Sequence, residues 1–158
     1  MRAVAESPST GTALDEFLSE RPWISRFAWA AMGLAAWAVL VTASWLHADG
    51  RGFGTHQQLG LPPCTFEAMT RVPCPGCGLT TSFTHMAHLS PWSALDAHPM
   101  GPVLFLITLV VAVAAPWAAK RGVAVHRVVQ HPWVTVALGL ALTLGLGTWG
   151  WRVVHKLV

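Results

Sequence analysis

The chain has 158 residues, enough for one domain of ordinary size. Hydrophobic residues make up 53% of it and charged residues only 11%, whereas soluble domains carry about 25% charged residues. The formal net charge of +3 reflects few acidic residues, and the scattered basic residues form no stripe of the kind that binds nucleic acid. Composition therefore excludes an ordinary water-soluble domain, argues against a nucleic acid partner and favours the lipid bilayer.

Residues 1–26 form a polar N-terminal segment ahead of the first apolar run. Its stretch ESPSTGT has a composition typical of disorder, and the following ALDEFLSERPW is compatible with one or two amphipathic turns at the membrane surface, or with none. A signal peptide is not expected, because several acidic residues precede an apolar run longer than the ~7–15 residues of a signal core. The first apolar run is therefore interpreted as an uncleaved anchor.

Three long runs without a charged residue follow, at residues 27–46, 101–119 and 133–151. About 20 apolar residues in a helix cross a hydrocarbon core of ~30 Å, and tryptophans gather near the ends of these runs, as they do at headgroup level. A soluble bundle of buried helices is the alternative, but no polar face recurs every three or four residues. The pattern predicts an all-α integral membrane protein with three transmembrane helices, in which residues 27–158 are a single membrane domain.

Small residues recur every four positions in two of these runs, at Ala31 and Ala35 in the first and at Ala137, Ala141 and Gly145 in the third. Small residues at this spacing let membrane helices approach closely and pack. We expect these faces to pack against the protein's own helices rather than in a dimer.

The distribution of lysine and arginine predicts the orientation, because cytoplasmic segments carry an excess of both. Six of them flank the spans on the side of the N-terminus: Arg2, Arg21, Arg26, Lys120, Arg121 and Arg127. Four lie on the other side: Arg51, Arg71, Arg152 and Lys156. We therefore predict a multi-pass protein of the cell inner membrane, with a cytoplasmic N-terminus and an external loop over residues 47–100.

The loop over residues 47–100 contains most of the unusual chemistry. Its first half is rich in Gly and Pro, which predicts irregular chain or short strands. Residues 79–89 then show a helical period, with Thr80, Thr81 or Ser82 as the expected cap. A second short helix is predicted to begin at Ser90 and to end at His98, before a proline.

Cys74 and Cys77 lie between these halves in the stretch Cys-Pro-Gly-Cys-Gly. Pro75 and Gly76 shape a turn that brings the two sulfurs together. Because Cys77 precedes a predicted helix, the backbone N–H groups of the first turn favour its thiolate, and we expect a lowered pKa for this thiol.

Three interpretations of the cysteines stay open. The first is a metal site, with zinc as the candidate metal, in which Cys64, Cys74 and Cys77 supply sulfur and His85 or His88 supplies nitrogen. Structural zinc sites use four ligands, often from two close pairs, and the sequence contains one close Cys pair. The second is a redox pair formed by Cys74 and Cys77, which leaves Cys64 over. The third is a rigid turn in which the cysteines pack as small hydrophobic residues.

The stretch Cys74-Pro75-Gly76-Cys77-Gly78-Leu79-Thr80, with the short helices and span that follow, resembles a family of small bacterial membrane proteins marked by a Cys-Pro-x-Cys-Gly-x-Thr motif. The resemblance covers about residues 60–115. That family is a domain of unknown function, so the resemblance implies a membrane location and singles out the motif without naming a reaction. The family pattern has Arg after the Thr and Asn before the Pro of the next span, where this chain has Thr81 and His98.

Two classes of function follow. One is an accessory or interaction protein of the membrane, with other membrane proteins as partners and a thiol turn that binds metal. The other is a membrane thiol–disulfide redox protein that uses Cys74 and Cys77. The sequence contains no phosphate-binding loop, nucleophile elbow or zinc-protease helix, so whether the protein is an enzyme stays open. Transport is disfavoured, because the three runs carry no charge.

Overall fold

The computed structural model describes residues 22–157, except for the side chains of residue 126 and residues 155–157. Most of the predicted polar segment 1–26 lies outside these residues. The described chain is helical throughout and contains no strand. Its elements are α2 (Pro22–Trp45), η1 (Thr55–Leu59), α3 (Thr65–Thr70), α4 (Leu79–Ala87), α5 (Pro91–Ala97), α6 (Gly101–Arg121), α7 (Val125–Val129) and α8 (Pro132–Leu157).

The three long helices α2, α6 and α8 are long and apolar enough to cross a membrane, which confirms the predicted fold class. Each is longer than the uncharged run that predicted it. The reason is that a run without charge marks only the part suited to hydrocarbon, whereas arginine and lysine at its ends are good helix formers and let the helix continue.

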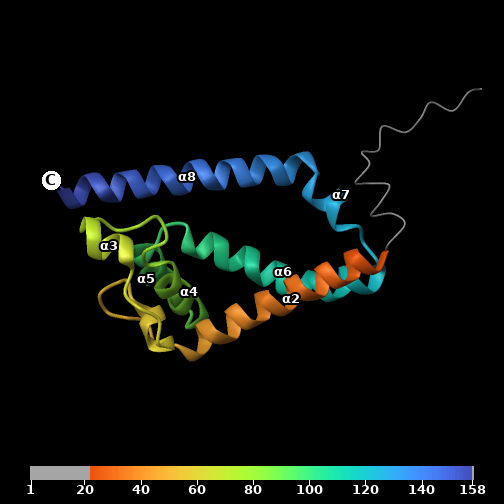
Figure 1. Cartoon of the computed structure of the whole chain (residues 1–158), viewed down its shortest axis with the longest axis horizontal. Coiled ribbons are helices and arrows are strands. Elements are labelled where there is room, and N and C mark those ends of the chain that lie inside the picture. The colour runs from red at the N-terminus through yellow and green to blue at the C-terminus, as the bar shows by residue number, and fades with distance from the viewer. Residues whose placement is uncertain (1–21, 158) are drawn as a thin grey trace, which may run out of the picture.

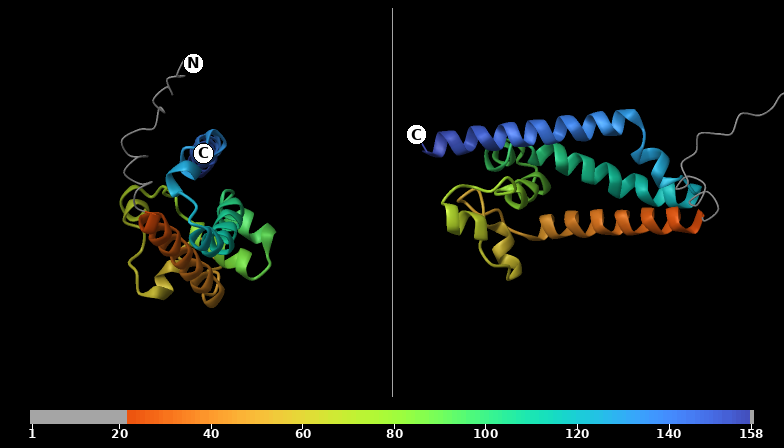
Figure 2. Two further views of the ribbon diagram at one scale, coloured as in Figure 1. Left: turned by 90° about the vertical axis from the view of Figure 1, so that its right-hand side faces the viewer. Right: turned by 45° about the horizontal axis from the view of Figure 1, so that its top comes forward.

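Helices α2 and α6 lie side by side and converge at the end away from the loop (Figures 1 and 2). Their contact is made by small residues, since a Cβ on Gly33 would lie 3.0 Å from Ala115 Cβ. The indole of Trp29 donates to Val123 O at 2.8 Å across the same seam. The predicted small pair Ala31 and Ala35 is exposed, so close packing occurs as expected but on a neighbouring face of the helix.

The short helices fill the space where α2 and α6 diverge, with α4 in contact with α2, α5 and α6 (Figure 1). The predicted start of α5 after Ser90 and its end at His98 are confirmed. Helix α4 begins at Leu79 with Gly78 as its cap, not with a hydroxyl residue. The hydroxyl groups instead face the interior, where Ser82 Oγ donates to Ala94 O at 2.7 Å. The first half of the loop forms η1 and α3 instead of strands.

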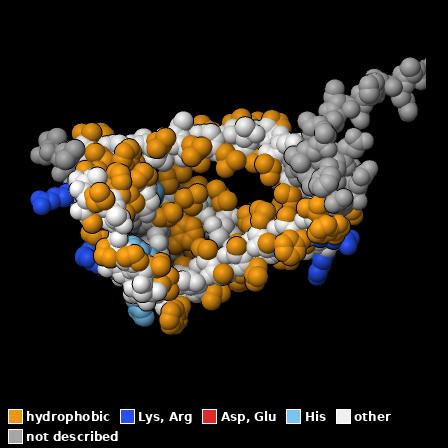
Figure 3. Space-filling view, in the orientation of Figure 1, with side chains coloured by type: hydrophobic (Ala, Val, Ile, Leu, Met, Phe, Trp, Pro, Cys, Tyr) orange, Lys and Arg blue, Asp and Glu red, His pale blue; other side chains and the backbone are white. Residues whose placement is uncertain are grey.

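Helix α8 stands apart from the other two long helices. None of its most apolar 18-residue window is buried, and Figure 3 shows an opening between α8 and the α2–α6 pair that is flanked by hydrophobic side chains. Ala137 is exposed, and Ala141 and Gly145 are half-buried. The predicted packing of this stripe against the protein's own helices is therefore not observed in the described residues. In the part of the chain that the structure describes, α8 meets the loop near its C-terminal end (Figure 2).

Candidate metal centre

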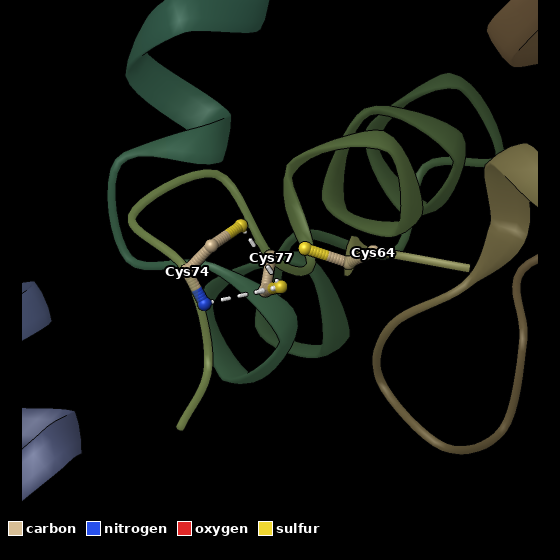
Figure 4. A group of neighbouring side chains, drawn as sticks. All are labelled: Cys64, Cys74 and Cys77. Atoms are coloured by element: carbon tan, nitrogen blue, oxygen red, sulfur yellow. Dashed lines mark hydrogen bonds between the residues drawn. The ribbon is translucent and has the colours of Figure 1, made fainter. Parts of the chain in front are cut away.

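The structure brings the three cysteines together. The Sγ atoms of Cys64, Cys74 and Cys77 all lie within 4.8 Å of one another. Figure 4 shows Cys64 pointing toward the other two from a separate segment of the loop. Cys74 Sγ and Cys77 Sγ are 3.0 Å apart, and all three residues are free thiols. Cys64 lies ten residues before Cys74, so its place beside the pair results from the fold and not from close spacing in the sequence.

Consecutive hydrogen bonds form the turn that holds Cys74 and Cys77. Cys77 N donates to Cys74 O at 3.0 Å, and Leu79 N donates to Gly76 O at 3.1 Å. Cys74 N also donates to Cys77 Sγ at 3.2 Å (Figure 4). Gly78 ends the turn with φ of 89°, and a Cβ there would overlap Ala97 O. Only glycine combines this left-handed backbone with so close an approach to another segment. We call residues 74–78 the thiol turn.

Helix α3 carries Cys64 to the thiol turn. Cys64 immediately precedes α3, and Arg71 follows it in a left-handed conformation with φ of 58°. Arg71 N donates to Glu67 O at 2.8 Å, which ends the helix and reverses the chain. Cys64 therefore lies directly before the six-residue helix α3, and the chain that leads to Cys74 begins directly after it, at Arg71.

The thiols differ in their electrostatic surroundings. A hydrogen bond from the Glu67 backbone N–H, and then one from the Cys74 thiol, lowers the pKa of Cys64. Burial, and then the hydrogen bond with Cys74, raises the pKa of Cys77 to about 12. The predicted lowering of the Cys77 pKa is therefore wrong. Cys77 does precede α4, but its side chain is only 8% exposed, and loss of solvent disfavours the thiolate more than the helix favours it.

The three sulfurs border a pocket of about 510 Å³. Phe53, Pro63 and Ala68 contribute apolar surface to its lining. The lining also includes polar and charged residues: Arg51, His56, Gln57, Glu67, Thr80 and Thr81. Cys77 Sγ lies 3.9 Å from Glu67 Oε2. The pocket gives the thiols access from outside, and Glu67 supplies an oxygen atom of the kind that accompanies sulfur in some zinc sites.

The predicted nitrogen ligands lie elsewhere. Among the described residues, the close group of ligand atoms contains the three cysteines and neither His85 nor His88. The ring Nε2 of His88 is 3.2 Å from Ser44 O. The physical reason is the direction of α4. The thiol turn adjoins the N-terminal end of this helix, whereas His85 lies about 9 Å of helical rise further along, at 1.5 Å for each residue.

The His98 side chain forms a hydrogen bond with the backbone of the thiol turn, a role that the sequence did not indicate. Its Nε2 lies 2.9 Å from Pro75 O, and its Nδ1 accepts from Met100 N at 3.2 Å. These partners define the neutral tautomer with the proton on Nε2. Burial lowers the pKa of His98, which preserves this arrangement. The sequence feature that marked this residue was its position before Pro99.

Two residues of α8 also contact the thiol turn and its surroundings. Trp149 Nε1 donates to Pro73 O at 2.7 Å. Arg152 donates from Nη1 to Cys77 O at 3.2 Å and from Nη2 to Ala97 O at 3.3 Å. In the sequence, Arg152 bears only on the predicted orientation, because a contact across 75 residues leaves no local pattern.

Comparison with known families yields one match. A family described as "Protein of unknown function (DUF2752)" matches residues 64–112, which begin at Cys64 and include the thiol turn, α4, α5 and part of α6. The match supports the predicted resemblance to a family of unknown function over less than half of the chain. It does not test the Cys-Pro-x-Cys-Gly-x-Thr motif or the bacterial origin. No curated protein and no solved structure matches the chain.

Proposed function

We propose that the three cysteines bind a soft divalent metal, zinc in the first place, in an accessory protein of the membrane. The observation that carries this proposal is the convergence of three sulfur atoms within 4.8 Å beside an accessible pocket. With Zn–S bonds of ~2.3 Å, sulfurs on a tetrahedral ion lie about 3.8 Å apart. Small changes in side-chain torsion therefore suffice to bring the three thiols to bonding distance.

Three protein sulfurs leave the fourth position of the metal to another ligand. Glu67 is the residue that we propose for it, because its Oε2 lies 3.9 Å from Cys77 Sγ and the carboxylate lines the same pocket. A water or a partner's side chain is the alternative, since metal sites that keep an open position use three protein ligands. An accessory protein with such a position would present its metal to another membrane protein.

We also propose that the protein resides in the bacterial inner membrane with the loop over residues 47–100 outside and the N-terminus in the cytoplasm. The support is the excess of lysine and arginine on the opposite side of the spans. A membrane-impermeant thiol reagent applied to intact cells, with outer-membrane access controlled, should then label the cysteines after chelation and mild reduction. Labelling only after lysis would reverse this orientation.

A specific contact favours a second function, thiol–disulfide exchange. Cys74 Sγ and Cys77 Sγ lie 3.0 Å apart, so a disulfide between them needs a shift of about 1 Å to the bond length of ~2.05 Å. In this reaction the two thiols would reduce a partner's disulfide, losing two electrons and two protons while the partner gains both. The Cys74–Cys77 disulfide would remain on the protein.

One experiment separates the two functions. The protein is purified in detergent without added metal, and zinc content and alkylatable thiols are measured before and after chelation and before and after reduction. Metal binding predicts about one zinc for each chain and thiols that become reactive on chelation. The redox function predicts no bound metal and two thiols that appear only on reduction.

The cysteine variants provide the matched test. Cys64→Ser, Cys74→Ser and Cys77→Ser should each abolish most metal binding, because a two-sulfur remnant binds zinc far more weakly than three. His88→Ala, which lies outside the cluster, is the control and should retain the metal. If Cys64→Ser keeps the metal while Cys74→Ser loses it, the three-sulfur site is refuted.

A further inference from the structure

We propose that Arg152 positions the thiol turn, and that metal binding at the thiols and docking of the C-terminal end of α8 stabilise each other. This inference rests on the metal-binding function proposed above. It assigns to α8 a role that neither its hydropathy nor the family match suggests, because the match ends at residue 112 and Arg152 lies forty residues beyond it.

The contacts of α8 with the loop converge on the thiol turn. Trp149 binds Pro73 O, directly before Cys74, and Arg152 binds Cys77 O. The indole and one guanidinium N–H thus hold the chain on both sides of the two cysteines. His98 holds Pro75 O between them. Side chains from two other segments therefore hold two carbonyl groups of the thiol turn and the carbonyl directly before it, and this restricts where its sulfurs can point.

Arg152 also joins two segments that the turn must keep together. Its two Nη atoms reach Cys77 O and Ala97 O, and these carbonyls are close because Gly78 has no side chain to separate them. A planar guanidinium with two parallel donors matches such a pair of acceptors, whereas a lysine ammonium cannot hold both in the same geometry. Arg152 therefore acts on the metal ligands indirectly, through the backbone of Cys77.

The change in charge at the metal site makes the coupling between metal binding and docking favourable. Metal binding makes the site more negative by one charge, because three thiols release three protons and gain a divalent ion; with the Glu67 carboxylate as fourth ligand the net charge of the site goes from −1 to −2. That negative charge forms beside the Arg152 guanidinium and attracts it, which strengthens docking. Docking strengthens metal binding by the same free energy, since coupling between two equilibria is reciprocal.

The rest of α8 does not prevent its C-terminal end from docking to the loop or detaching from it. Its apolar stretch is not buried against the described chain, and an opening separates it from α2 and α6 (Figure 3). The end of α8 can therefore detach from the loop without disrupting the α2–α6 seam. We expect docking of this end to depend on its contacts with the loop, among them the hydrogen bonds of Trp149 and Arg152.

The test uses the full chain in detergent with Co²⁺ as the probe, because its absorption reports both affinity and the number of bound thiolates. Arg152→Gln should weaken Co²⁺ binding at least tenfold and alter the charge-transfer spectrum, and Arg152→Lys should restore part of the affinity. Trp149→Phe should weaken binding less. Arg127→Gln removes an exposed arginine of α7 and should leave binding unchanged. In the wild type, Co²⁺ should slow hydrogen exchange of residues 149–157, and in Arg152→Gln it should not.

The outcomes are distinguishable. If the wild type does not bind Co²⁺, the metal-binding function is refuted, and this inference with it. A wild type that binds Co²⁺ with Arg152→Gln matching it in affinity and spectrum would refute the positioning role alone. Hydrogen exchange of the α8 end that does not respond to Co²⁺ in the wild type would refute the coupling.

Discussion

The α2–α6 pair and the loop over residues 47–100 differ in how their segments are held together. The seam between α2 and α6 relies mainly on close contact of small side chains, as at Gly33 and Ala115. Two tryptophans of α2 add hydrogen bonds to backbone carbonyls across it. The loop relies on directional bonds from side chains to backbone carbonyls, such as Ser82 to Ala94 O and His98 to Pro75 O. In hydrocarbon there is no hydrophobic force between helices, so close packing is the available means of association.

This difference explains where a chemical site can form. Close packing fixes the distance between two helices but leaves them free to slide by small amounts, whereas a network of hydrogen bonds fixes individual atoms. A metal site needs ligands held within about 0.5 Å of their positions. Side-chain bonds to backbone carbonyls are more numerous in the loop than across the seam, and the three cysteines meet in the loop.

The largest effect expected from this comparison concerns glycine in the two regions. Gly78→Ala should destabilise the protein by about 3 kcal/mol or more, because the left-handed backbone disfavours a side chain and the Cβ would overlap a carbonyl that cannot move. Gly33→Ala should cost only about 1 kcal/mol, since its Cβ would lie 3.0 Å from Ala115 Cβ and the helices can separate slightly.

Denaturation in detergent, followed by circular dichroism, measures both changes. Gly139→Ala is the control, because a Cβ there meets nothing within 4 Å and alanine favours a helix. It should be neutral or slightly stabilising. If Gly33→Ala proves more damaging than Gly78→Ala, the loop is not the rigid region that we describe.

The next effect is the pH dependence of metal binding. The pKa of Cys77 is raised to about 12, so this thiol is protonated in the free protein throughout pH 6–8 and must release its proton to bind metal. Zinc affinity should therefore rise at least tenfold for each unit of pH in this range. Competition with a chelator whose own titration is corrected for measures the slope. An affinity independent of pH would contradict metal binding through Cys77.

A smaller effect is expected at His98, which connects the loop to the start of α6. Because its folded-state pKa is lowered by burial, neutral His98 contributes stability that is fully present above the unfolded pKa of ~6.5 and is lost as the pH falls through the folded value. His98→Asn keeps an acceptor for Met100 N but does not reach Pro75 O, and should cost about 1–2 kcal/mol at pH 7. The wild type should lose more stability than this variant between pH 7 and pH 5, in denaturation measured at both values.

The fold was largely predictable from the sequence, because each long helix coincides with a run of uncharged residues. The start of α5 was also predictable, since Ser90 and Pro91 act locally on the first turn. The site was predictable only in part. The Cys-Pro-Gly-Cys spacing brought Cys74 and Cys77 together, as expected, and the third thiol was named as a candidate on residue type alone.

What the sequence could not reveal depends on contacts between distant segments. Arg152 and His98 act through carbonyls 75 and 23 residues away, and no local periodicity encodes such contacts. The shift of the Cys77 pKa also depends on burial, which raises this pKa more than the position of the residue before a helix lowers it. His85 lies in α4 and His88 directly follows it; this helix begins next to the thiol turn and leads away from it.

The smallest effect expected concerns Glu67. Its carboxylate lies near Cys77 Sγ, at 3.9 Å, and its backbone N–H supports Cys64. Glu67→Gln changes only the side chain, so the support of Cys64 by the backbone is preserved. If the carboxylate binds the metal, this variant should weaken zinc binding about three- to fivefold, which is less than the loss of any sulfur, because zinc retains three thiolates and water can take the fourth position. The Co²⁺ charge-transfer bands, which arise from sulfur, should keep their intensity while the weaker visible bands shift with the changed fourth ligand. Glu67→Asp shortens the side chain by one methylene and should recover little affinity, since its oxygen would lie further from Cys77 Sγ than the 3.9 Å of Glu67 Oε2. Unchanged affinity and visible bands in Glu67→Gln would assign the fourth position to water or to a partner, and the site would then be an open one.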